Sequence, residues 1–263
     1  MNDDAIPEIS SEPSEDVTVP AVPPQKQNSL WTLSAALACI WTCTVLVQVG
    51  GFGVIILRHY LKTGHVAMPE ESFSFLLSLT YVDWFFALLI AYYVSVIRVR
   101  RSVREAFALK PISAAVAAKS FALGVAASII AAVLLTWFGT GDAPVYDLAI
   151  KEKEGVAEMV LPFILLAVLV PPMEELYYRG FIFPILRARL SAAWAIGIVA
   201  VWFGLLHVAQ LWGEWLGIAI VLLLGMIWTI QRHRYDSLFP SIISHWTYNI
   251  CIVVSQSIAL RFQ

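Results

Sequence analysis

Polar residues recur at helical spacing in three strongly apolar parts of this 263-residue chain. They are Glu174, Glu175 and Arg179 in PPMEELYYRG, Phe203 and His207 in FGLLH, and His245 and Asn249 in HWTYN. Ionisable groups inside a bilayer cost several kcal/mol each, so each one needs a partner or a use. Carboxylates and imidazoles can activate water, and imidazole and amide groups can stabilise an oxyanion, so the three motifs together offer the groups needed for peptide hydrolysis.

The spacing predicts different tasks for the two neighbouring acids. Glu175 precedes Arg179 by four residues, which is the favourable order for an ion pair on one face of a helix. Glu174 points about 100° away around the same helix. We therefore expect Glu175 and Arg179 to support the site and Glu174 to be left for chemistry.

The two histidine motifs each place a pair of side chains on one helix face. Phe203 lies one turn below His207, and His245 lies one turn before Asn249. We expect Glu174 to act as general base and His207 to hold the same water molecule. In this interpretation His245 and Asn249 donate hydrogen bonds to the oxyanion.

The composition predicts a membrane protein. Hydrophobic residues make up 59% of the chain and charged residues only 14%, compared with roughly 25% charged residues in soluble domains. The net charge is −2 and there is no Lys/Arg-rich arm, so we expect the lipid bilayer as a partner and no nucleic acid.

Apolar runs long enough to cross a bilayer predict an all-α, polytopic transmembrane bundle of about seven or eight spans. The candidate spans are 30–57, 73–97, 115–138, 157–187, 192–211, 214–231 and 237–260. We expect a disordered tail over 1–29, N-terminal membrane helices over 30–156 and catalytic helices over 157–260. Pro171 and Pro172 predict that the fourth run is kinked or broken.

Lys and Arg are concentrated after the second, fourth and sixth spans, which favours a cytoplasmic N-terminus. A turn near Leu190 sets Glu174 and His207 about 25 Å from that turn, whereas His245 is only about 15 Å into its span. On this count, Glu174 and His207 lie toward the side of the membrane away from the cytoplasm, and helix tilt or kinking must bring His245 level with them.

The ordered motifs EExxxR, FxxxH and HxxxN resemble those of the CPBP family of intramembrane proteases. This family groups CAAX prenyl endopeptidases of the Rce1 type with bacterial relatives linked to bacteriocin immunity. The resemblance covers roughly 157–255 and implies an endopeptidase that cuts a membrane-embedded or lipidated peptide or protein substrate. It also implies the same roles for Glu174, His207, His245 and Asn249, and an integral protein of the bacterial plasma membrane.

Two questions stay open at this point. The family is classed with metalloproteases, and Glu174, His207 and His245 are possible ligands for a divalent metal such as zinc, but they lack a recognised zinc spacing, which favours directly activated water. The polar cluster also fits a non-enzymatic membrane immunity or scaffold protein, or a transporter. No inverted repeat is visible in the sequence, and this makes the transporter the weakest alternative.

Overall fold

Every regular element in the described part of the chain is helical, as predicted. The structure is a computed structural model that describes residues 38, 53–54, 56–65, 84–140, 164–208, 211 and 213–259. The elements are the helix Trp84–Arg98 with its π-helical end η2 (Tyr93–Arg98), α3 (Val103–Ala106), α4 (Ala114–Phe138), η3 (Ile164–Leu169), α7 (Val170–Glu175), η4 (Leu176–Ile182), α8 (Phe183–Arg187), α9 (Ala192–Leu206), α10 (Trp215–Tyr235) and α11 (Phe239–Ala259). The expected tail 1–29 and most of the first span lie outside the described residues.

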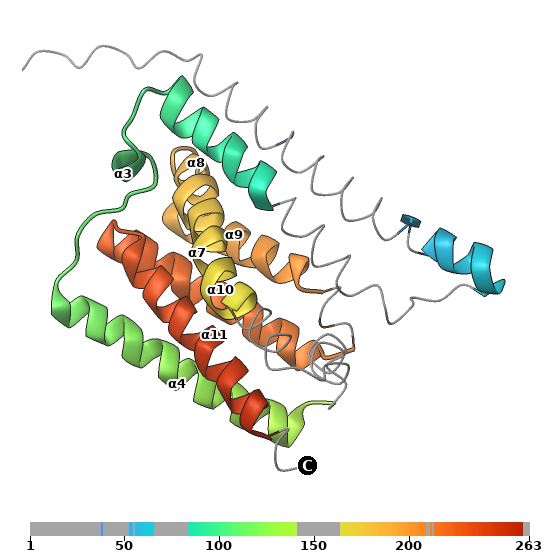
Figure 1. The fold of residues 1–263 in the computed structure, drawn as a ribbon. Helices are drawn as coiled ribbons and strands as arrows, with labels where there is room; N and C mark the ends of the chain where they lie inside the picture. Colours follow the sequence, from blue (N-terminus) through green and yellow to red (C-terminus); the bar gives the residue numbers. More distant parts are fainter. Residues whose placement is uncertain are drawn as a thin grey trace, which may run out of the picture.

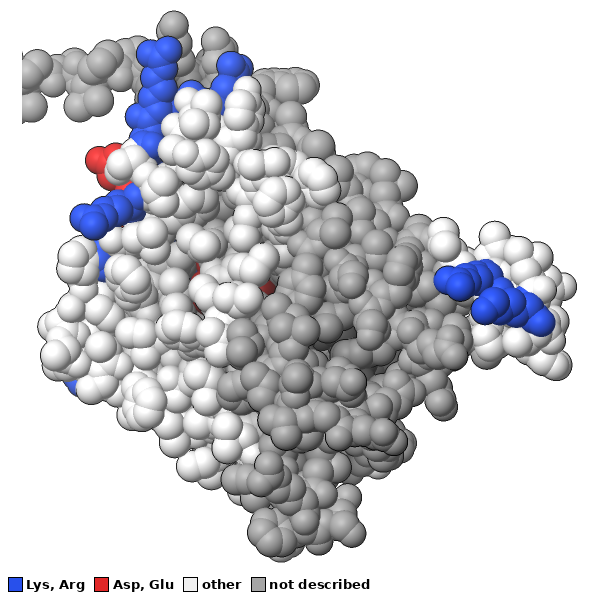
Figure 2. Space-filling model, in the orientation of Figure 1, with Lys and Arg blue, Asp and Glu red and all other residues white. Residues whose placement is uncertain are grey.

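Two of these helices, α4 and α10, are long and apolar enough to cross a membrane. The helices Trp84–Arg98 and α9 are apolar but shorter. Only 17% of the most apolar part of α4 is buried within the protein, and large side chains such as Phe121, Ile129 and Trp137 are exposed. Such a surface suits lipid and not water, and the Lys and Arg residues visible in Figure 2 lie toward the edges of the face. A polytopic bundle agrees with these helices, and the count of seven spans stays a prediction.

The predicted interruption of the fourth run takes the form of changes in helix type. Consecutive helical segments extend from Ile164 to Arg187, and π-helical stretches flank the short α7. Pro171 and Pro172 occupy the first turn of α7, where the missing N–H donors are best tolerated. π-helical turns widen the spacing of side chains around a helix and are frequent at functional sites.

The helix α4 packs against α11 through a stripe of small residues, and the two run side by side in Figure 1. The buried residues of α4 are Ser120, Gly124, Ser128 and Ala131, which share one helix face. A Cβ added at Gly124 would lie 2.5 Å from the carbonyl oxygen of Ser244 and 2.7 Å from Cβ of Thr247. Glycine is therefore required here for the two backbones to approach, as in other close membrane helix pairs.

The positively charged loops meet at one end of the bundle. The backbone N–H of Leu238 donates to the carbonyl oxygen of Ala108 (3.0 Å), and the Ser237 hydroxyl donates to that of Lys110 (2.7 Å). The Lys110 ammonium also donates to Asp236, and this hydrogen bond lowers the pKa of the Asp236 carboxyl. The loops after the second and sixth predicted spans are thus joined, which agrees with the expectation that they lie on one side of the membrane.

Replacing Gly124 by valine tests the close contact between α4 and α11. We expect Gly124→Val to lower the free energy of unfolding by about 1–3 kcal/mol relative to Gly197→Val, because the new side chain must push α11 away. Gly197 is a matched control, since a Cβ added there meets nothing within 4 Å. The measurement is unfolding of the purified protein in detergent, and equal stability of the two variants would show that the contact is not tight.

Candidate active site

The guanidinium of Arg179 is the centre of the buried polar cluster. Its side chain is 0% exposed and donates three hydrogen bonds. Nη1 donates to Oε1 of Glu175 (3.0 Å), Nε to Oγ1 of Thr229 (3.1 Å) and Nη2 to the carbonyl oxygen of Gly225 (2.9 Å). The predicted ion pair between Glu175 and Arg179 is therefore present, and it ties α7 and η4 to α10.

Glu175 connects this arginine to the first residue of the third motif. Its Oε1 also lies 3.0 Å from Nδ1 of His245. A carboxylate only accepts hydrogen bonds, so Nδ1 of His245 carries the proton and donates it. Oε2 of Glu175 is buried and has no hydrogen-bond partner among the described residues, which is an unusual condition in a folded protein.

The orientation of His245 brings its other nitrogen to Glu174. Nε2 of His245 lies 3.6 Å from Oε2 of Glu174, and both side chains are buried. The indole of Trp228 stacks on the imidazole, with ring centres 3.7 Å apart and planes at 17°. The imidazole is therefore fixed by a carboxylate in its plane and an aromatic ring across its face.

The cluster is electrically neutral only when Glu174 and His245 share one proton in addition to the proton on Nδ1 of His245. Arg179 and an ionised Glu175 cancel each other, so Glu174 and His245 must form either an ion pair or a neutral pair. Burial of a net charge away from water is costly, so the other protonation states are disfavoured. At 3.6 Å the two side chains lie within ion-pair distance of each other but form no direct hydrogen bond.

The ring of Phe203 joins the second motif to this cluster. It lies 4.6 Å from Cζ of Arg179, 6.0 Å from the His245 ring and 4.7 Å from the His207 ring. Nδ1 of His207 lies 2.8 Å from the carbonyl oxygen of Phe203. A carbonyl oxygen accepts only, so Nδ1 carries a proton, and in the neutral imidazole Nε2 is an acceptor.

The antiparallel packing of α9 against η4 explains the depth of His207. Phe203 faces Arg179, so the residue one turn beyond Phe203 lies at the level of the residue one turn before Arg179. Those residues are His207 and Glu175. The expected agreement in depth between the acid pair and His207 follows from this contact.

The site lies closer to the turn between α10 and α11 than to the turn near Leu190. Trp228 lies seven residues before the end of α10, and His245 lies six residues after the start of α11, so both are about 10 Å from that end. A Cβ added at Gly180 would lie 3.6 Å from Cδ2 of Leu238, so α11 begins at the level of Gly180 and not of Leu190. The site therefore lies nearer the basic end, and no large tilt is needed to bring His245 to the acids.

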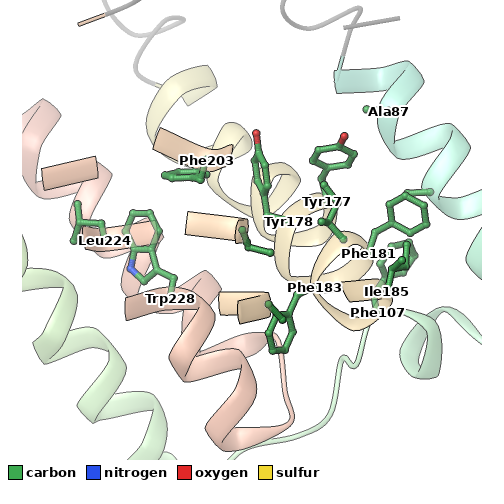
Figure 3. Close-up of a cluster of buried hydrophobic side chains, with 14 of the residues drawn as sticks. Ala87, Phe107, Tyr177, Tyr178, Phe181, Phe183, Ile185, Phe203, Leu224 and Trp228 are labelled. Atoms are coloured by element: carbon green, nitrogen blue, oxygen red, sulfur yellow. The ribbon is translucent and has the colours of Figure 1, made fainter. Parts of the chain in front are cut away.

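Aromatic side chains enclose the cluster. Figure 3 shows Phe203 on α9 between Trp228 on α10 and Tyr178 of the central helical segment, with Tyr177 and Phe181 farther along that segment. Tyr178 lies edge-on to Phe203, with ring centres 5.2 Å apart. In the middle of the face in Figure 2, acidic atoms are visible only below the surface, between uncharged side chains.

Sequence reasoning found Glu174, Glu175, Arg179, Phe203 and His245, and these residues are in mutual contact or joined through shared neighbours. His207 joins them through Phe203, and Asn249 lies half-buried one turn after His245 on α11. Sequence reasoning missed the α10 residues, which are Gly225, Trp228 and Thr229. The only signal was their place in an apolar span, because a tryptophan and a threonine there are ordinary packing residues.

The candidate metal ligands do not form a three-ligand site in this arrangement. Among the described residues, no group of three or more His, Cys, Asp or Glu side chains is placed to hold a metal ion. Nδ1 of His245 lies on Glu175 and Nδ1 of His207 lies on the Phe203 carbonyl oxygen, so Nε2 of each ring is left for a further contact. Because Glu174, His207 and His245 are not brought together as three ligands, this arrangement does not match a structural or catalytic zinc site.

One family model matches the chain. The family described as type II CAAX prenyl endopeptidase Rce1-like matches residues 156–251, and this confirms the resemblance based on the three motifs. No curated protein matches the chain, and no solved structure matches it. The family is one of proteases, and together with the apolar helices α4 and α10 it supports a hydrolase that is an integral membrane protein.

Removing the central guanidinium tests how the cluster is held together. We expect Arg179→Met to lower the free energy of unfolding by about 3–5 kcal/mol, because Glu175 becomes a buried carboxylate without its main counter-charge. The double variant Glu175→Gln/Arg179→Met removes both charges and should recover much of that loss. Unfolding in mixed detergent micelles measures both variants, with the exposed Arg104→Met as control, and a single variant as stable as the unmodified protein would contradict this assignment.

Proposed function

Because residues 156–251 match the Rce1-like protease family, we propose that this protein is an intramembrane endopeptidase that resembles CAAX prenyl proteases. Its substrate is a membrane-embedded or lipidated peptide or protein, cut within or near the bilayer. The observation that carries the proposal is the short contact path from Arg179 through Glu175 and His245 to Glu174. A purely structural pair would end at Glu175, whereas here a second acid faces the oriented imidazole.

Water activation is the first task in this mechanism. Glu174 accepts a proton from the attacking water as general base, starting from the ion-paired form in which His245 carries the extra proton. His207 holds the same water through Nε2, since its Nδ1 is used by the carbonyl oxygen of Phe203. The oxygen of the water then bonds to the carbonyl carbon of the scissile peptide.

Stabilisation of the negative oxygen is the second task. His245, with its proton on Nε2, and the amide of Asn249 donate hydrogen bonds to the oxyanion of the tetrahedral intermediate. Glu174 then delivers the proton to the leaving nitrogen, the carbon–nitrogen bond breaks, and the products are a carboxylic acid and an amine. Glu175, Arg179 and Trp228 do not touch the substrate in this scheme but keep His245 in position.

Burial of the cluster in apolar and aromatic surroundings suits a reaction on a membrane substrate. A low-dielectric site strengthens the hydrogen bonds to the oxyanion, since no bulk water competes for them. The site lies about 10 Å from the basic end, so a segment near one surface of the bilayer can reach it. Because Lys and Arg concentrate in the loops at this end, the surface is the cytoplasmic one.

Substitution of the base and of the second imidazole tests the proposal. We expect Glu174→Gln and His207→Ala each to reduce cleavage of a peptide substrate by at least about a hundredfold, the usual scale of general-base catalysis, without loss of folding. Matched controls are Glu105→Gln and His65→Ala, which alter exposed residues of the same types. Cleavage is followed by mass spectrometry of the products, and normal turnover by either active-site variant would remove the proposal.

The effect of chelators tests the choice of directly activated water. We expect prolonged dialysis against a zinc chelator to leave the cleavage rate of the purified protein within about twofold, because the donor set does not fit a three-ligand zinc site. The cleavage rate and the metal content are measured on the same samples. Loss of activity on chelation, with recovery on adding zinc back, would show that a metal takes part.

A second candidate is a non-enzymatic membrane immunity or scaffold protein. The completely buried pair of Glu175 and Arg179 favours it, since the pair also joins η4 to α10 structurally. In that case Glu174→Gln would change stability and not catalysis. Measuring the stability of Glu174→Gln together with its cleavage activity therefore separates the two candidates: a catalyst loses cleavage and keeps its stability, and a scaffold loses stability.

A further inference from the structure

A hollow of about 320 Å³ opens at the basic end of the bundle, between the last turns of α8 and α10. Arg187 lines it from α8, Arg232 and His233 line it from α10, and Phe183 and Asp236 complete its wall. Its size is in the range of small-ligand sites in proteins. It lies outside the candidate active site, and none of the residues in the proposed mechanism lines it.

Positive charge exceeds negative charge around this hollow. Asp236 is the one carboxylate in its wall, and it is shared between Lys110 and Nη1 of Arg232, which lies 3.1 Å from Oδ1. Arg187 is exposed and donates only to a backbone oxygen, that of Leu190 (2.8 Å). Arg187 and Arg232 thus line the hollow with a single carboxylate, and that carboxylate is also shared with Lys110 outside the hollow, so positive charge is in excess.

The guanidinium of Arg232 is only partly satisfied. The residue is 8% exposed, and its buried Nε has no hydrogen-bond partner in the described part of the chain. Burial of a donor on a charged group without an acceptor costs free energy, which an added anion would offset.

The depth of the hollow corresponds to the headgroup layer of a bilayer. The helix α10 has 21 residues and is therefore about 31 Å long, close to the thickness of the hydrocarbon core. Arg232 and His233 lie in its last turn. Basic pockets between membrane helices at this level are typical sites for the phosphate of anionic lipids.

We propose that this hollow binds the phosphate headgroup of an anionic phospholipid, with Arg187 and Arg232 as its ligands. The bound lipid would join the end of α8 to the end of α10. The inference concerns a surface separate from the proposed catalytic cluster and holds whether or not the protein is a protease.

The test is lipid binding by the full-length protein in a neutral detergent. Native mass spectrometry measures the binding of dioleoyl phosphatidylglycerol and of dioleoyl phosphatidylcholine, which differ in net charge. We expect the first to bind at least about tenfold more tightly, and Arg187→Gln to lower its affinity by about tenfold, or about 1.4 kcal/mol. Arg104→Gln removes one exposed charge from the same end and should change the affinity by no more than about twofold, as expected for a screened surface charge.

Several outcomes would overturn the proposal. Equal losses for Arg187→Gln and Arg104→Gln would indicate a general attraction of lipid to a basic surface and no built site. Full competition by equimolar inorganic phosphate would identify a site for free phosphate, and binding of a peptide carboxylate in place of the lipid would identify a peptide site. Arg232→Gln is the second variant, and unchanged lipid affinity in both folded arginine variants would equally reject the assignment.

Discussion

A guanidinium that is completely removed from solvent must be neutralised and hydrogen-bonded, and Arg179 imposes this requirement on its neighbours. Glu175 supplies the charge, and Thr229 and the Gly225 carbonyl supply acceptors from another helix. Because Glu175 is held in this way, it can in turn hold the imidazole of His245. The position of the imidazole next to Glu174 is thus a consequence of one buried charge, and the proposed chemistry depends on it.

Small and polar residues on α4 pack closely against the helices that hold the site. Gly124 lets α4 approach the backbone of α11 near Ser244, directly before His245 in the sequence. The Ser244 hydroxyl donates to Oε1 of Gln231 (2.6 Å), and the amide of Gln231 donates to Ser120 (3.3 Å). This network connects α4, α10 and α11 one helix turn or less from the site.

Local spacing in the sequence predicted the parts of the site that lie on one helix. The i, i+4 relation gave the ion pair of Glu175 with Arg179 and the ring contact of Phe203 with His207, because both are fixed by helix geometry. The contribution of α10 could not be predicted, since nothing local distinguishes Trp228 from a core tryptophan until His245 is packed against it. The level of His245 relative to the acids could not be predicted for a related reason: it depends on where α11 begins against Gly180, which is a tertiary contact.

The same contacts serve either a catalyst or a scaffold, so the decisive question is whether a peptide carbonyl enters the cluster. The most direct measurement is an experimental structure of the Glu174→Gln variant in lipid with a bound peptide substrate. Our interpretation predicts the scissile carbonyl carbon within roughly one water molecule of residue 174, with reacting atoms about 3–3.5 Å apart and the carbonyl oxygen facing His245 and Asn249. A peptide bound elsewhere, with the cluster closed by packing, would contradict it.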